Sequence, residues 1–332
     1  MNESRAIALQ MCRFPAYLEA GLKARFDIIR WFELSEPEKA GVLRQHAKAV
    51  RAVVTGGHIG CADDLMMALP SLGIVAINGV GVDKVNLSLA QQRGVYVTTT
   101  PGVLTEDVAD LAVGLLIGLL RGIPAADAYV RAGKWLTSER PLARKVSGRR
   151  FGIVGLGHIG SAIAARLMAF GPVAYTGPRQ KPQAAYTFHG SAKDLAAASD
   201  VLVIACPANA STHHLIDVAV LDALGPEGYL VNVARGSVID EPALITALDT
   251  GRIAGAALDV FDNEPRVPAE LIASPKVVLT PHVASATVET RMHMSEVVLA
   301  NLDAFLSGRP PASAVVQGML PFTSAATVQT RG

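Results

Sequence analysis

The sequence predicts an α/β protein made of two domains, each built around a parallel sheet. Short apolar runs alternate with helical patterns along the chain, which is typical of parallel βα units. A GxGxxG motif follows one of these runs in mid-chain, where a dinucleotide-binding sheet would begin. A length of 332 residues also suits two domains.

The expected strands fall into two sets, one on each side of the segment around residue 100. They are 6–11, 52–54, 74–77 and 95–98, then 151–154, 173–176, 201–205, 229–233, 254–259 and 277–280. The second set is rich in Val, Ile and Leu, which suits strands buried on both faces. Helices are expected over 83–93, from near Thr105, and over about 287–306.

Turn signals predict the domain boundaries. Thr99-Thr100-Pro101-Gly102 precedes the long helix, and the last strand of the second set ends near Pro281-His282. We therefore expect a substrate domain of residues 1–100 plus 286–332 and a dinucleotide-binding domain of residues 101–285. The tail from Gly308, with its Pro, Ser and Thr, is expected to be loosely ordered.

Composition excludes several functional classes. Half of the residues are hydrophobic and the net charge is +1, so nucleic acid is not an expected partner. The longest apolar run, 111–120, is far short of the ~20 residues that span a bilayer, and no secretory signal is recognised. Cys12, Cys61 and Cys206 lack metal-ligand spacing, which indicates reduced thiols, no metal site and a cytoplasmic location.

The glycine motif predicts the cofactor. Gly155 permits a tight turn, Gly157 lets backbone N–H groups approach a pyrophosphate, and Gly160 allows the following helix to pack on the sheet. The other residues of this predicted loop are Leu156, His158 and Ile159.

The strand after the motif bears on the choice between NAD and NADP. An NAD enzyme normally carries an acid at its end, to bind the ribose hydroxyls. Here the strand ends at Thr176 and is followed by Arg179 and Lys181, which favours the extra phosphate of NADP. The alternative is a solvated basic loop.

Three polar residues follow later strands, where ligands collect in open α/β sheets. Arg235 would bind a substrate carboxylate through its guanidinium, and His282 would supply a proton as hydride reaches a carbonyl carbon. Glu264 would favour and orient the imidazolium. Separately, each could be an ordinary surface charge, loop carboxylate or core histidine.

The segments 155–160, 232–240, 257–265 and 280–287 together resemble those of the D-isomer-specific 2-hydroxyacid dehydrogenase family. The resemblance covers nearly the whole chain. It implies two Rossmann-like domains, a catalytic domain made from both chain ends, an active site in the interdomain cleft, and a homodimer. It also implies that Arg235 binds substrate, that Glu264 pairs with His282, and that His282 is the acid/base.

The same resemblance implies further contacts. Asp259 would bind the nicotinamide carboxamide or position Arg235. Loop N–H groups at Val80 and Gly81 would hold the substrate carboxylate. Trp135, in a segment similar to a dimer-embracing region, would reach the partner's pocket or simply pack in the interface. The remaining cofactor contacts expected from it are Cys206, Pro207, Thr212, Val233, Ala234, His282 and Ala284.

Within the family, the chain is most similar to the glyoxylate/hydroxypyruvate and hydroxyphenylpyruvate reductase branch. We therefore expect NADPH-dependent reduction of glyoxylate to glycolate and of hydroxypyruvate to D-glycerate, with NADP(H) preferred over NAD(H). One alternative is a bulkier 2-oxo acid such as hydroxyphenylpyruvate. Another, of a different class, is a nucleotide-sensing protein similar to the family's corepressors.

Overall fold

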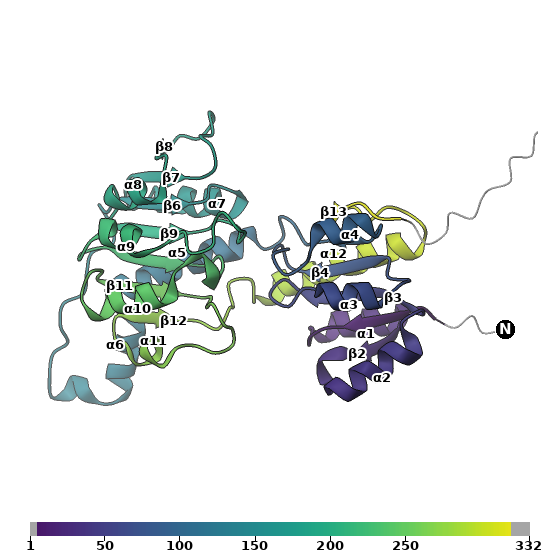
Figure 1. Cartoon of the computed structure of the whole chain (residues 1–332). Helices are drawn as coiled ribbons and strands as arrows, with labels where there is room; N and C mark the ends of the chain where they lie inside the picture. The colour runs from purple at the N-terminus through teal and green to yellow at the C-terminus, as the bar shows by residue number, and fades with distance from the viewer. Residues whose placement is uncertain (1–4, 320–332) are drawn as a thin grey trace, which may run out of the picture. The chain divides into compact units, whose positions relative to one another are not determined.

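The computed structural model describes residues 5–319 and divides the chain into two compact units (Figure 1). Unit 1 comprises residues 1–104 and 287–332, and unit 2 comprises residues 105–286. The chain therefore leaves the first unit, builds the second, and returns.

Unit 1 is built on a six-stranded sheet with strand order β13-β5-β4-β3-β1-β2, parallel except for β13. Its strands are β1 Ile7–Gln10, β2 Asp27–Arg30, β3 Val50–Gly56, β4 Ile74–Asn78, β5 Tyr96–Thr98 and β13 Ala314–Val316. Its helices are α1 Ala16–Arg25, α2 Glu36–His46, α3 Asp63–Ala68, α4 Leu87–Gln92 and α12 Val288–Leu306.

Alternation along the strands gives this sheet two apolar faces. Val54 and Ala76 belong to a core cluster with residues of α1 and α12, whereas Val53, Val75 and Ile77 belong to one with residues of α3 and α4. Successive strand side chains point to opposite faces. The even-numbered residues from Ala8 of β1, Ala52 of β3, Ile74 of β4 and Tyr96 of β5 onward therefore face α1 and α12. Val50, which lies before a register shift between β1 and β3, belongs to the other cluster.

Unit 2 is built on a seven-stranded sheet with order β12-β11-β10-β9-β6-β7-β8, in which every pair is parallel. Its strands are β6 Phe151–Val154, β7 Val173–Thr176, β8 Thr187–Phe188, β9 Val201–Ile204, β10 Tyr229–Asn232, β11 Gly255–Leu258 and β12 Val277–Leu279. Its helices are α5 Thr105–Arg121, α6 Ile123–Arg131, α7 His158–Leu167, α8 Ala192–Ala197, α9 Val218–Leu224, α10 Glu241–Asp249 and α11 Ala269–Ala273.

The strand order of unit 2 changes direction at β6. β6 pairs with β7 on one side and with β9 on the other, so the chain proceeds outward in both directions from this strand. Ligands of open α/β sheets bind outside the carboxyl ends of the strands at such a switch point. The glycine motif follows β6 directly, at this point of the sheet.

The predicted fold class is confirmed, and most strand predictions match the structure to within two residues. The sequence missed β2, β8 and β13. The expectation of a loosely ordered tail from Gly308 is wrong where β13 pairs antiparallel with β5, and it falls outside the described residues beyond 319. The helix expected over 83–93 is also shorter, because α4 begins only after Asn86, whose side chain accepts a hydrogen bond from Leu89 N.

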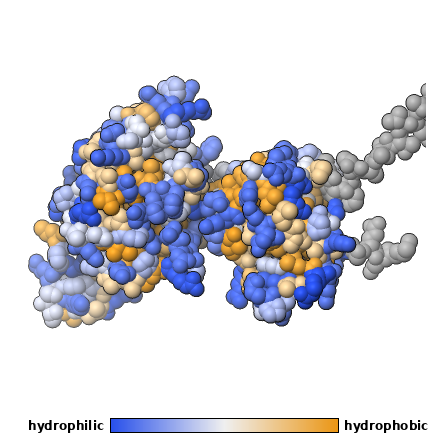
Figure 2. All heavy atoms as spheres, in the orientation of Figure 1, coloured by the Kyte–Doolittle hydropathy of each residue, from blue (hydrophilic) through white to orange (hydrophobic). Residues whose placement is uncertain are grey.

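Hydrophilic residues cover much of the visible surface, and hydrophobic residues are exposed in smaller areas between them (Figure 2). Within the described residues, no single helix is long and apolar enough to cross a membrane. α5 and α6 pass that test only together, and they are bent by 60° at the break between them.

Candidate active site

The glycine loop between β6 and α7 is held in shape by close contacts. Gly155 has a φ of 94°, and a Cβ there would lie 2.6 Å from Cys206 Cα. A Cβ at Gly160 would lie 1.9 Å from the Gly155 carbonyl oxygen. Gly155 N also donates to Thr176 O at 2.9 Å, which ties the loop to the end of β7. Only glycine can occupy positions 155 and 160 without a steric clash.

Gly157 differs from its neighbours because it faces open space. A Cβ built there meets no atom within 4 Å, and the residue is exposed at the start of α7. Space beside a helix N-terminus that follows a glycine turn suits a pyrophosphate, whose oxygens accept from backbone N–H groups. The residues present therefore fit a dinucleotide cofactor.

The loop after β7 carries the two predicted phosphate-binding cations. Arg179 is exposed and makes no hydrogen bond or ion pair with any residue in the described range. Lys181 lies against the glycine loop, because its Nζ donates to the Leu156 carbonyl and its backbone N donates to Tyr175 Oη at 2.7 Å. Thr176 is buried at the end of the strand. Lys181 therefore lies beside the glycine loop, whereas Arg179 is an exposed cation of the loop that follows β7.

Arg235 is positioned by the turn that follows β10. Asn232 is fully buried; its Nδ2 donates to Arg235 O at 2.9 Å and its Oδ1 accepts from Ala234 N at 3.0 Å. Arg235 Nη1 donates to Ala234 O at 2.8 Å. A Cβ at Gly236 would lie 1.9 Å from the Phe261 carbonyl carbon, so this turn packs directly on the segment after β11.

Asp259 organises the segment that carries His282. Its carboxylate is fully buried and accepts from Thr280 Oγ1 at 2.6 Å, from Val283 N at 2.8 Å and from Ala284 N at 3.0 Å. Its backbone O accepts from His282 N at 2.8 Å. Charge-assisted bonds of this kind are about twice as strong as neutral ones. Asp259 therefore acts on His282 through the loop around it.

Glu264 and His282 form a close pair. Glu264 Oε2 lies 2.7 Å from His282 Nδ1, and Glu264 Oε1 accepts from Phe261 N at 3.0 Å. His282 has a φ of 53°, a left-handed conformation that a non-glycine residue holds only where its surroundings fix it. The contact with the carboxylate fixes the orientation of the imidazole ring, with Nδ1 directed at Glu264.

The loop after β9 supplies the last predicted cofactor contacts. Thr212 Oγ1 donates to Pro207 O at 2.7 Å, which closes the turn. Burial raises the pKa of the Cys206 thiol to about 11, so the thiol is uncharged at neutral pH and is not a nucleophile. Cys206 packs against Gly155.

The structure brings together most of the predicted site residues at one edge of the unit 2 sheet, because the carboxyl ends of its parallel strands coincide. Val80 and Gly81 lie in unit 1, after β4. The described residues contain no group of three or more His, Cys, Asp or Glu side chains placed to hold a metal ion. The predicted site residues on segments that follow the carboxyl ends of the unit 2 strands include Gly155, Leu156, Gly157, His158, Ile159, Gly160, Thr176, Cys206, Pro207, Thr212, Val233, Ala234, Arg235, Asp259, Glu264, His282 and Ala284.

Sequence reasoning missed Asn232 and Thr280 as supporting residues. Asn232 begins the segment 232–240 and Thr280 begins the segment 280–287, so their places in these family-like segments could have indicated a supporting role. What each side chain bonds depends on the turn that follows it, and no spacing in the sequence specifies that turn.

Comparison with known proteins places this edge in context. The family model described as "D-isomer specific 2-hydroxyacid dehydrogenase, NAD binding domain" matches residues 113–284. The chain is 48% identical over 309 residues to glyoxylate/hydroxypyruvate reductase A of Arabidopsis thaliana, covering 93% of this chain and 98% of that protein. It is 47% identical to the hydroxyphenylpyruvate reductase of Plectranthus scutellarioides, with the same coverage.

A solved structure of a protein with a similar name also matches the fold of this chain. The crystal structure of an NADPH-dependent glyoxylate/hydroxypyruvate reductase from Sinorhizobium meliloti, in complex with NADP and malonate, superposes with a TM-score of 0.88 at 42% identity. The match covers 95% of this chain and 98% of that one.

Proposed function

Because the chain belongs to the D-isomer specific 2-hydroxyacid dehydrogenase family, we propose that it is an NADPH-dependent reductase of glyoxylate and hydroxypyruvate, forming glycolate and D-glycerate. The observation that carries this proposal is the Glu264–His282 pair, 2.7 Å apart, on a loop fixed by Asp259 at the edge that holds the glycine turn. An acid/base and a dinucleotide cradle at one sheet edge suit reduction of a carbonyl.

The proposed mechanism assigns one task to each residue. The glycine loop of Gly155, Gly157 and Gly160 would hold a nicotinamide dinucleotide, which would supply hydride for the carbonyl carbon. The guanidinium of Arg235 binds the substrate carboxylate through bidentate hydrogen bonds, and the loop N–H groups of Val80 and Gly81 are further donors. His282 gives its Nε2 proton to the carbonyl oxygen as negative charge develops there. Glu264 holds the imidazole ring in place through its contact with Nδ1.

A preference for NADPH is supported by the loop after β7. Arg179 is an exposed cation without a partner among residues 5–319, and Lys181 lies on the carbonyl of Leu156 in the glycine loop. No carboxylate follows Thr176 in the segment 177–181 to bind a free ribose hydroxyl. We propose that the 2′-phosphate of NADPH is bound by these two cations.

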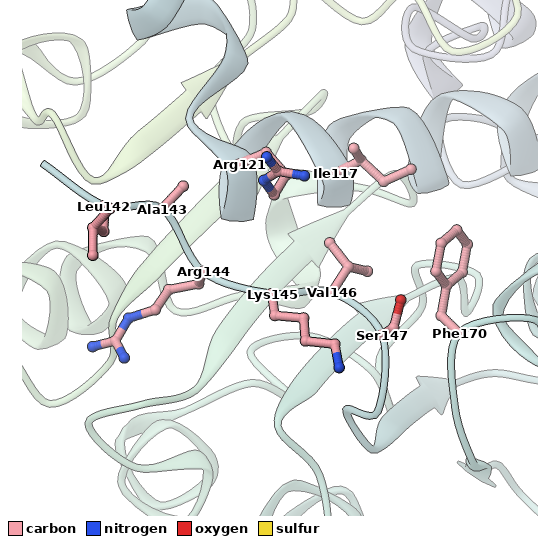
Figure 3. Close-up of a pocket in the computed structure, with 9 residues that line it drawn as sticks. All are labelled: Ile117, Arg121, Leu142, Ala143, Arg144, Lys145, Val146, Ser147 and Phe170. Atoms are coloured by element: carbon pink, nitrogen blue, oxygen red, sulfur yellow. The ribbon is translucent and has the colours of Figure 1, made fainter. Parts of the chain in front are cut away.

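We also propose that the protein is a homodimer. Apolar side chains are exposed along 123–142 of unit 2, including Trp135 at 73%, Leu136 at 90% and Leu142 at 99%. The residues that follow, Leu142 to Ser147, run past Ile117 and Arg121 of α5 (Figure 3). Together with Phe170 they line an open pocket of about 500 Å³. Several large apolar side chains exposed on one segment favour a second copy of this surface as the occupant. Trp135 would then face the partner.

Of the two alternatives, only the one with a bulkier substrate has a specific observation in its favour. The similarity to a hydroxyphenylpyruvate reductase favours a bulkier 2-oxo acid as the second candidate substrate. A nucleotide-sensing role would need the dinucleotide-binding loop but not the Glu264–His282 pair.

We also propose a cytoplasmic location. The thiols of Cys12, Cys61 and Cys206 are free, which suits a reducing compartment.

The experiment that tests the proposal is a substrate panel with both cofactors. Oxidation of NADPH and NADH would be followed with glyoxylate, hydroxypyruvate, pyruvate and hydroxyphenylpyruvate. We expect the highest kcat/KM with NADPH and one of the first two acids. Absence of turnover with every 2-oxo acid would overturn the enzyme assignment, and a preference for hydroxyphenylpyruvate would favour the second candidate.

A further inference from the structure

Polar residues also lie at the carboxyl edge of the unit 1 sheet. Asn78 ends β4, and its register partner Gly56 ends β3. A Cβ at Gly56 would lie 3.6 Å from Cys12 Sγ. Thr100 follows β5, and its N donates to Gly79 O at 2.8 Å. Gly56 and Asn78 lie two residues beyond Val54 and Ala76, on the face that packs against α1 and α12. The contact with Gly56 places Cys12 beside them, and the bond to Gly79 places the backbone of Thr100 at the same edge.

Arg291 of α12 points toward the same edge. Ser295, Val298, Leu302 and Phe305 form the buried stripe of this helix, and Arg291 continues it one turn earlier. Phe305 packs beside Gly73, before β4, so α12 runs against the strands and its first turns lie at their carboxyl ends. Helical side chains lean toward the helix N-terminus, which carries the guanidinium to that edge.

Arg291 is a cation without an acidic partner. Its guanidinium makes no hydrogen bond or ion pair with any residue of the described range, and burial lowers its pKa. Cys12 faces it but is a neutral thiol, since burial raises the pKa of Cys12 to about 11. The nearest acid to Cys12 on α1, Glu19, already accepts from Gln10 Nε2 at 3.0 Å and from Phe14 N at 3.2 Å.

Two buried polar atoms beside the substrate loop are also unpaired. Asn78 is 7% exposed and Thr100 is fully buried, yet Asn78 Oδ1 and Thr100 Oγ1 have no hydrogen-bond partner among residues 5–319. An unpaired buried acceptor costs about 1–3 kcal/mol, so such groups in a native protein need an explanation. Asn78 precedes Gly79 in the chain and the backbone N of Thr100 donates to Gly79 O, so both residues adjoin the loop of Val80 and Gly81.

We propose that Asn78, Thr100 and Arg291 bind the part of the substrate beyond its 2-oxo group and select 2-oxo acids that carry hydroxyl groups there. This inference rests on the proposed reductase function. A substrate hydroxyl donates to Asn78 Oδ1 or exchanges hydrogen bonds with Thr100 Oγ1, and Arg291 donates to a substrate oxygen. An aromatic side chain would leave all three groups unpaired. The favoured class is therefore the 2-oxo aldonic acids, with hydroxypyruvate as their shortest member, over arylpyruvates.

The test compares kcat/KM for four acids in the full-length protein: glyoxylate, hydroxypyruvate, a 2-oxo aldonic acid and phenylpyruvate. In the wild type, we expect the two hydroxylated acids to exceed phenylpyruvate. In Arg291→Met, we expect the ratio of a hydroxylated acid to glyoxylate to fall at least about tenfold, as loss of a charge-assisted hydrogen bond requires. Arg44→Met, the same replacement at an exposed arginine of α2, should keep the wild-type ratio.

Asn78→Leu is a second variant that is expected to fold. It replaces an unpaired acceptor by an apolar side chain of similar size, so its Tm should equal or exceed that of the wild type. The ratio of hydroxylated acid to glyoxylate should fall by about threefold to tenfold. A lower Tm with an unchanged ratio would indicate a structural role and overturn the inference.

The two proposals fail differently. If glyoxylate and hydroxypyruvate are reduced but Arg291→Met and Asn78→Leu leave their ratio at the wild-type value, the inference is wrong and the reductase function stands. Preference for phenylpyruvate in the wild type would also overturn it. If the wild type reduces none of the four acids, the proposed function itself fails.

Discussion

The carboxyl edges of the two sheets differ in how their polar groups are paired. In unit 2, Asp259 accepts three hydrogen bonds and Glu264 lies 2.7 Å from His282. In unit 1, Asn78 Oδ1 and Thr100 Oγ1 have no partner within residues 5–319, and Arg291 has no acid beside it.

This difference separates two tasks. Groups that perform chemistry must be held in the productive geometry before the substrate arrives, so they are bonded to one another and to backbone N–H groups. Groups that select a substrate gain most when the ligand supplies their missing bonds. Substitutions in unit 2 should therefore affect all substrates alike, whereas those at the unit 1 edge should change their ranking.

The largest effect is expected from His282→Ala. Removing the proton donor should lower kcat by about 10²–10⁴-fold for every 2-oxo acid, because general acid catalysis contributes that much. NADPH binding, measured by fluorescence titration, should persist. A rate close to that of the wild type would remove His282 from the mechanism.

Asp259→Asn should have the next largest effect. The new amide N–H group would face Val283 N or Ala284 N, so the His282 loop would lose charge-assisted bonds worth about 1.5–3 kcal/mol each. We expect kcat to fall about tenfold to a hundredfold for all substrates, with a lower Tm. Asp262→Asn, at an exposed carboxylate of the following loop, is the matched control. Equal effects in both variants would contradict the positioning role.

Arg179→Ala should act on one cofactor. We expect KM for NADPH to rise about tenfold, since one charge-assisted contact to the 2′-phosphate is lost, and KM for NADH to change far less. Lys193→Ala removes an exposed cation from α8 and serves as the control. If Arg179→Ala raised both KM values equally, a phosphate contact would be excluded.

The smallest effect on the chemistry is expected from Leu142→Asp. A charge at this exposed apolar position should weaken self-association, which sedimentation velocity would detect as a shift toward monomer. Ile272→Asp, at another exposed apolar residue of unit 2, should not shift it. A wild-type protein that sediments as a monomer would overturn the dimer proposal.

Local sequence pattern determined much of the fold. β6 and β7 have the predicted bounds because Phe151–Val154 and Val173–Thr176 are apolar runs ended by turn residues. β13 escaped prediction because it has only three residues, follows prolines, and exists through pairing with the distant strand β5. β8, with two residues, is equally dependent on its neighbour β7.

For the candidate site, the sequence predicted the chemical residues but not the contacts that position them. The residue types at 235, 264 and 282 indicate their chemistry directly, and the structure places Glu264 against His282. The interactions of Asp259 depend on backbone N–H groups of a loop whose conformation no residue type encodes. Likewise, the unpaired state of Asn78 is a property of packing, so only the structure reveals it.

The division between chemistry and selection is tested most directly by one set of values: kcat/KM for glyoxylate and hydroxypyruvate in the wild type, His282→Gln and Asn78→Leu. We expect His282→Gln to lower both values by the same factor and Asn78→Leu to change their ratio. A changed ratio in His282→Gln together with an unchanged ratio in Asn78→Leu would contradict the division.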